Sequence, residues 1–227
     1  MKSSIKFVFI LLIASSCTIQ AKDYLENPKE SFDYDLLDMH PDKPTSFKDA
    51  IQKHALWQTK QEVIYDGSYV RLEYPGGDVS ADRGVCTDVV VRALRSVGID
   101  LQKEIHEDMK KALSQYNKRY KTEHIDPSID HRRTQNIETY LERKGCTVKP
   151  SKSSSELAYQ KGDIVFFDFA YGHVGIVTDI LSEDNQNTPL LVHNIGSGPV
   201  LDNFLSDMKV SGHYRLSEEL FQDLMAK

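Results

Sequence analysis

Apolar residues recur at three- and four-residue intervals through the first two thirds of the chain, which is the period of an amphipathic helix. Four segments show this spacing, at residues 46–59, 86–98, 101–116 and 136–144. Ser46 and Asp100 stand where helix N-caps are expected, and Gly145 stands where a helix ends. The first part of the chain is therefore predicted to be helical.

The pattern changes after about residue 160, where β-branched and aromatic runs are separated by Gly, Asn, Asp and Pro. These runs predict strands at residues 163–167, 173–180, 190–195 and 210–216. A short helix is expected from Glu218, after a capping Ser217. Helices followed by strands indicate an α+β fold, and residues 46–227 have the length of a single domain.

The start of the chain has the organisation of an export signal: basic residues, a short apolar core and then small residues. Cleavage after Ala21 would remove residues 1–21 as a signal peptide. Cleavage before Cys17 would remove residues 1–16 and leave a cysteine for lipid attachment. Both alternatives stay open, and the intact mass of the mature protein separates them. Residues 22–45 then form a polar leader, and the protein is expected in the periplasm or as an outer-membrane-associated lipoprotein.

The chain is acidic, with 34 Asp and Glu against 28 Lys and Arg and a formal net charge of −6. Loss of the signal removes Lys2 and Lys6 and makes the charge more negative. No basic stripe is available to neutralise phosphates, so no nucleic-acid partner is expected. Contact with a membrane is expected only through a lipid anchor at Cys17.

The most informative cysteine is Cys86, in the first turn of a predicted helix. A helix N-terminus favours a thiolate, so we expect a lowered pKa and a nucleophilic role for Cys86. Cys146 follows a predicted helix and reads as a small buried apolar residue. A disulfide between Cys86 and Cys146 is the alternative interpretation in an oxidising compartment.

Two histidines lie at strand positions downstream, His173 at the start of one predicted strand and His193 within the next. A thiol nucleophile needs a base, and the base needs a group that orients it. If these strands are antiparallel neighbours, His173 is the base for Cys86 and His193 is the orienting group. The alternative is that each histidine is an ordinary surface or core residue.

Residues 162–167 (Gly-Asp-Ile-Val-Phe-Phe), 172–177 (Gly-His-Val-Gly-Ile-Val) and 192–194 (Val-His-Asn) resemble the signature of the NlpC-type cell-wall cysteine peptidases. That resemblance implies a papain-like fold with His173 as the catalytic histidine and His193 as its partner. The nucleophile of that family usually lies in Asp-Cys-Ser-Gly, whereas residues 85–88 are Val-Cys-Thr-Asp. The surroundings of Cys86 therefore depart from the usual pattern.

A closer resemblance extends over roughly residues 46–216. It is carried by residues 74–78, 82–89, 129–133, 192–196 and 212–215. These segments resemble the YijF-like family of exported bacterial proteins, which is grouped in the papain-like clan. The resemblance implies an NlpC-type, papain-like α+β fold, with N-terminal helices packed on a small antiparallel sheet.

Four further residues are candidates for supporting or binding roles. Tyr74 is expected to donate near the oxyanion, as an upstream tyrosine does in NlpC-type enzymes, with loop packing as the alternative. Asp88 is expected to support the start of the helix or the preceding loop. Arg132 and Arg133 are candidates for binding a substrate carboxylate, with a structural ion pair as the alternative.

The sequence has no Gly-rich phosphate loop and no zinc-ligand spacing, so no cofactor and no metal are expected.

These observations predict a cell-envelope amidase or endopeptidase that cleaves an amide bond in peptidoglycan stem peptides, with Cys86, His173 and His193 as the catalytic triad. An acyl transferase or deamidase with the same triad is one alternative, because an acyl-cysteine reacts with nucleophiles other than water. A catalytically inactive binding module of the cell envelope is another, because Asp-Cys-Ser-Gly is missing.

Overall fold

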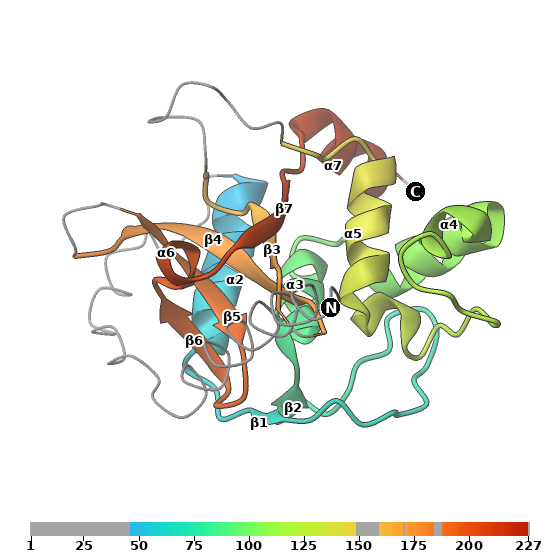
Figure 1. Cartoon of the computed structure of the whole chain (residues 1–227), viewed down its shortest axis with the longest axis horizontal. Helices are drawn as coiled ribbons and strands as arrows, with labels where there is room; N and C mark the ends of the chain where they lie inside the picture. The colour runs from blue at the N-terminus through green and yellow to red at the C-terminus, as the bar shows by residue number, and fades with distance from the viewer. Residues whose placement is uncertain (1–45, 149–158, 170, 184–187, 227) are drawn as a thin grey trace, which may run out of the picture.

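The computed structural model describes residues 46–148, 159–169, 171–183 and 188–226 (Figure 1). The expected signal, Cys17 and the leader at residues 22–45 lie outside these ranges. Helices occupy the first part of the described chain and a five-stranded antiparallel sheet the second, which confirms the α+β pattern. Within the described ranges, no helix has the length and apolar character needed to cross a membrane.

The four helices expected before residue 145 are all present. They are α2 (Phe47–Gln58), α3 (Cys86–Arg95), α4 (Leu101–Tyr116) and α5 (Thr134–Arg143). Ser46 accepts a hydrogen bond from the Asp49 N–H at 3.2 Å, and Asp100 accepts one from Gln102. A short 3₁₀ helix, η2 (Asp130–Arg132), precedes α5, and α7 (Glu218–Met225) follows its predicted cap at Ser217.

The sheet has the strand order β6-β5-β4-β3-β7. The strands are β3 (Ile164–Phe167), β4 (His173–Leu181), β5 (Pro189–Asn194), β6 (Pro199–Asp202) and β7 (Val210–Tyr214). β4 and β5 are antiparallel neighbours, as the interpretation of His173 and His193 requires. β6 and the four-residue helix α6 (Phe204–Asp207), which follows it, were not predicted.

Alternation along the strands divides the apolar side chains between two cores. Val174 of β4 and Val192 of β5 belong to the large core that also contains α3, and Figure 1 shows this helix beside the sheet. Val177 of β4 and Leu191 of β5 belong to a smaller core closed by Phe204 of α6. The two faces of the sheet are therefore covered by different elements.

Two short parallel strands lead the chain into α3. β1 (Ile64–Tyr65) pairs with β2 (Arg83–Gly84), with Tyr65 opposite Gly84. Val85 follows β2, and Cys86 begins α3 directly afterwards. The β1–β2 pair therefore brings Tyr65 near the cysteine, although 20 residues separate them in the sequence.

A buried carboxylate ties the start of β3 to the end of β7. Asp163 is fully buried and receives two hydrogen bonds from Arg215, at 2.6 and 2.7 Å, and faces His213 Nε2 at 2.7 Å. Burial opposes ionisation, but the hydrogen bonds from Arg215 and His213 outweigh it and lower the pKa of Asp163. His213 thus lies within a strand, and the Gly-Asp and Gly-His-Tyr-Arg motifs form one structural contact.

Replacing Asp163 with Ala should lower the free energy of unfolding by about 3–5 kcal/mol, because it removes the fully buried carboxylate that binds the partly buried Arg215 and His213 side chains. Asp168→Ala is the matched control, since Asp168 pairs with Lys209 at an exposed position and should cost less than about 1 kcal/mol. Urea denaturation measures both changes. Equal effects of the two substitutions would contradict the role given to Asp163.

Candidate functional site

Cys86 lies at the floor of an open pocket of about 390 Å³. Its side chain is 6% exposed and is the first of α3. The aromatic rings of Tyr65, Tyr120 and Tyr171 contribute to the lining, together with Arg133. The pocket therefore combines a thiol at a helix N-terminus with aromatic walls and a cation.

The sulfur of Cys86 lies against the first residues of β4. The backbone N–H of Val174 lies near enough to the thiol to lower its pKa, and Gly172 lines the same pocket. His173 is the residue between them, so its backbone passes directly beside the thiol. This contact joins the candidate nucleophile to the strand that carries the candidate base.

Burial raises the pKa of Cys86 to about 12, and the nearby Asp88 carboxylate adds to the rise, although backbone hydrogen bonds from Val174 and Thr87 oppose it. The prediction of a lowered pKa for Cys86 is therefore wrong for the free protein. The helix N-terminus favours a thiolate, but the cost of removing that charge from water is larger. The resting site holds a neutral thiol.

His173 and His193 are in direct contact, and the contact extends to a third residue. His173 Nε2 lies 2.9 Å from His193 Nδ1, and His193 Nε2 lies 3.0 Å from Asp202 Oδ1. Both imidazoles are buried, and the ring of Phe204 packs against each of them. Burial lowers the pKa of His173 to about 3 and also lowers that of His193, so both rings are neutral at physiological pH.

The structure does not bring the His173 ring onto the sulfur. Val174 faces the core that contains α3, so the preceding His173 faces the side covered by Phe204 of α6. Across the residues that the structure describes, no hydrogen bond joins the Cys86 thiol to His173. The His173–His193 contact is thus formed, whereas the Cys86 thiol lies beside the backbone at the start of β4.

Asp88 and Arg132 form a buried ion pair beneath the pocket. Arg132 donates to both carboxylate oxygens of Asp88, at 2.8 and 2.9 Å, and the two side chains are 2% and 3% exposed. Asp88 also accepts the Val85 N–H at 2.7 Å, which caps α3. Asp88 therefore supports the helix start, as expected.

Arg132 lines the pocket, but its guanidinium is committed to Asp88 and to backbone carbonyls of Asp66 and Ser68. The structure thus favours the structural ion pair over substrate binding for this residue. Arg133 differs: its guanidinium lies over the Tyr120 ring at 4.6 Å, and its buried Nε has no hydrogen-bond partner among the described residues. Of the two arginines, Arg133 is therefore the one that lines the pocket without a carboxylate from the described part of the chain bound to it.

Tyr74 lies outside the pocket that contains Cys86, which is where an oxyanion donor would be needed. Its hydroxyl donates to Glu107 at 2.9 Å and its ring packs on His106, and it does not line the Cys86 pocket.

Tyr65 lines the Cys86 pocket instead. Partial burial raises the pKa of Tyr65 to about 12, with the Cys86 and Asp88 charges adding, so its hydroxyl remains a donor. Local sequence spacing carries no signal for this position of Tyr65, because it follows from the pairing of β1 with β2, which are distant in the sequence.

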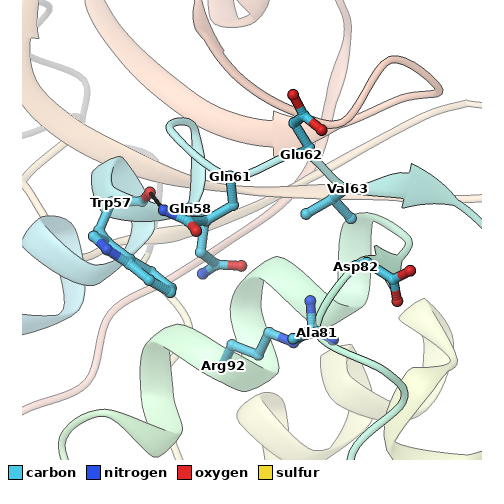
Figure 2. A pocket seen from close by; sticks show the side chains of 8 residues that line it. All are labelled: Trp57, Gln58, Gln61, Glu62, Val63, Ala81, Asp82 and Arg92. Atoms are coloured by element: carbon cyan, nitrogen blue, oxygen red, sulfur yellow. Dashed lines mark hydrogen bonds between the residues drawn. The ribbon is translucent and has the colours of Figure 1, made fainter.

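A second pocket, of about 290 Å³, lies at the opposite end of the β1–β2 pair and is lined by Val63 and Asp82. Figure 2 shows the indole of Trp57 on α2 and the Arg92 side chain on α3 reaching into this region. Arg92 is held by the Asp78 carboxylate and by carbonyls of the loop before β2. Its charge therefore serves to fix that loop.

The structure also bears on disulfide formation and on metal binding. Cys86 and Cys146 are both free, so the disulfide interpretation is wrong for this structure. Across the described residues, no three His, Cys, Asp or Glu side chains are grouped as a metal site requires.

The fold and the site define an α+β domain with a buried cysteine at a helix start and a His-His-Asp series on its sheet. The chain belongs to the family described as a domain of unknown function, DUF1287, which it matches over residues 52–216. It is similar to the uncharacterized protein YijF of Escherichia coli (strain K12), with 46% identity over 168 residues, 73% of this chain and 80% of the relative. No solved structure matches the chain.

Alkylation of Cys86 by iodoacetamide should be more than about 100-fold slower at pH 7.5 than that of a model thiol with a pKa of about 8.5, because little thiolate forms. Its rate should still rise with pH above 9. Peptide mass spectrometry reads out Cys86 separately from Cys146, and Cys86→Ser confirms the assignment. Fast labelling that is already at its plateau below pH 7 would contradict a neutral resting thiol.

Removing the Arg132 charge should destabilise the fold more than removing an exposed arginine. Arg132→Met leaves the Asp88 carboxylate buried without its partner and should cost about 3–5 kcal/mol. Arg83→Met removes a more exposed pair with Asp66 and should cost less than about 1 kcal/mol. Urea denaturation compares the two, and a smaller cost for Arg132→Met than for Arg83→Met would refute the structural role.

Proposed function

We propose that this protein is an exported, papain-like thiol hydrolase that cleaves an amide bond in peptidoglycan stem peptides. The observation that carries the proposal is the contact between the Cys86 sulfur and the start of β4, where His173 begins a buried His-His-Asp series. The resemblance of residues 162–167 and 172–177 to NlpC-type peptidases supports it. The expected export signal supports the location, because an exported protein meets the cell wall.

The neutral resting state decides how the nucleophile would be activated. With Cys86 and His173 both uncharged, the thiol proton passes to His173 as the sulfur attacks the carbonyl carbon, and no thiolate accumulates beforehand. Because the His173 ring faces Phe204 and His193 on the other side of the sheet, this transfer requires the start of β4 to rearrange and bring the ring to the sulfur when substrate fills the pocket. Catalytic hydrogen bonds are commonly loose in free enzymes and tighten in the substrate complex.

Donors for the oxyanion are available at the pocket. Cys86 and Thr87 begin α3 and line the pocket, where the first N–H groups of a helix lack a carbonyl four residues earlier, and Tyr65 lines the same pocket. When the tetrahedral intermediate collapses, the carbon–nitrogen bond breaks and the leaving amine takes the proton from His173. Water then hydrolyses the thioester and restores the Cys86 thiol.

The pocket lining indicates which substrates fit. Arg133 lines the pocket with its guanidinium beside the aromatic face of Tyr120, and Tyr171, which also lines the pocket, has most of its surface exposed. A peptide with a nearby carboxylate would pair with Arg133 and pack on these rings. Stem peptides carry such carboxylates. An acyl transferase or deamidase would use the same acyl-cysteine with another acceptor.

A binding module without catalysis is the second candidate, and two observations favour it. The pKa of Cys86 is raised, and the thiol has no hydrogen bond to His173 in the described structure. In that case the same pocket would hold a stem peptide through Arg133 and the tyrosines without cleaving it.

Incubation of the purified protein with sacculi or muropeptides, followed by mass spectrometry of the products, tests the hydrolase. Wild type should release peptide fragments, and Cys86→Ala and His173→Ala should abolish release, because each removes a group that takes part in every turnover. Unchanged cleavage by Cys86→Ala would refute the proposal of a thiol hydrolase. Binding of sacculi without cleavage by the wild type would favour the binding module.

Paired tyrosine variants sharpen this test. Tyr65→Phe should lower kcat by about 10²–10³-fold if its hydroxyl stabilises the oxyanion. Tyr74→Phe, which removes a hydroxyl bonded to Glu107 outside the pocket, should leave kcat unchanged.

A further inference from the structure

The contacts among His173, His193 and Asp202 form a series that contains two hydrogen bonds, at 2.9 and 3.0 Å. Both imidazoles are neutral, so each carries one proton, on either Nδ1 or Nε2. Each hydrogen bond needs one donor and one acceptor. The position of a single proton in the series therefore determines the position of the others.

An ionised Asp202 can only accept, so the His193 Nε2 must carry a proton and donate it. The His193 Nδ1 then has a free lone pair and accepts the N–H of His173 Nε2. This leaves the His173 Nδ1 unprotonated, which is the state a general base for Cys86 needs.

A protonated Asp202 reverses every donor in the series. Its O–H donates to His193 Nε2, the proton of His193 then lies on Nδ1, and that N–H donates to His173 Nε2. The remaining proton of His173 must lie on Nδ1, which then cannot accept a proton from the thiol. Neither imidazole changes its charge in this reversal.

We propose that Asp202 sets the tautomers of both histidines, and that its protonation switches His173 from a base to a form unable to accept the thiol proton. Its link to catalysis rests on the proposed hydrolase function, in which Asp202 is a positioning residue that acts through His193. The tautomer switch itself rests on the hydrogen-bond geometry and on the neutral state of the two buried imidazoles.

The surroundings of Asp202 place this switch near neutral pH. Burial raises the pKa of Asp202 to about 7; the backbone N–H of Phe204 opposes the rise and the Asp207 carboxylate of α6 adds to it. His193 on β5 faces the carboxyl directly, and His173 on β4 lies behind it. As the pH falls through about 7, Asp202 takes up a proton while both imidazoles stay neutral, so the base form is present above this pH and lost below it.

Long-range proton–nitrogen NMR on protein labelled with ¹⁵N-histidine reads the tautomers directly. The chain has eight histidines, and His173→Gln and His193→Gln identify the two signals. At pH 8.5 both rings should be protonated on Nε2, and at pH 5.5 both on Nδ1, with one shared midpoint. Imidazolium signals at pH 5.5, or tautomers that do not change between these pH values, would overturn the proposal.

Two carboxyl variants separate the switch from a structural effect. In Asp202→Asn the amide oxygen keeps the Phe204 N–H, the amide N–H₂ faces His193, and both rings should stay protonated on Nδ1 at every pH. Asp207→Asn removes a neighbouring negative charge and should keep the switch but move its midpoint to lower pH. A wild-type switch in Asp202→Asn would by itself overturn the proposal, because the amide does not titrate.

An activity assay tests the link to catalysis independently of the NMR spectra. In the peptidoglycan assay, kcat should fall as the pH drops through the NMR midpoint, and Asp202→Asn should lower kcat at pH 8.5 by about 10²-fold or more with a smaller effect on KM. A tautomer switch in a protein that cleaves nothing would support the switch and refute the hydrolase. A kcat independent of Asp202 in an active enzyme would refute the positioning role.

Discussion

The buried ion pair between Asp88 and Arg132 is the interaction on which the geometry of the pocket depends. Asp88 caps α3 through the Val85 N–H, and Arg132 binds the Asp66 and Ser68 carbonyls of the segment after β1. One contact thus fixes the helix start that carries Cys86, the 3₁₀ helix η2 and the loop beyond Tyr65. A buried pair of this kind contributes positional definition more than net stability, because desolvation offsets much of its attraction.

Desolvation also decides the electrostatics of the site. Burial keeps the Cys86 thiol, both imidazoles and, up to about pH 7, the Asp202 carboxyl in their neutral forms. A neutral thiol and two neutral imidazoles exchange no resting charges, so their chemistry depends on the placement of protons. The proposed activation of Cys86 during attack and the proposed control of His173 by Asp202 are two consequences of this one property.

Much of the fold could be predicted because its signals are local. The helical spacing and the caps at Ser46 and Asp100 correspond to α2 and α4, and alternating apolar runs correspond to β3, β4, β5 and β7. β6 and α6 have four residues each, too few for a period to show. That omission also hid Asp202. Tyr65 was not predicted to line the pocket, because the pairing of β1 with β2 joins distant segments and leaves no mark in local spacing.

By itself, the sequence determined the order of helices and strands, the position of Cys86 at a helix start and the placement of His173 and His193 on neighbouring strands. These follow from periodicity, capping and turn residues, which act over a few positions. The tertiary structure alone decided that Arg132 pairs with Asp88, that Tyr65 lines the pocket, that Asp202 completes the histidine series and that the pKa of Cys86 rises. Burial and contacts between distant segments set these properties, and both arise only when the chain is packed.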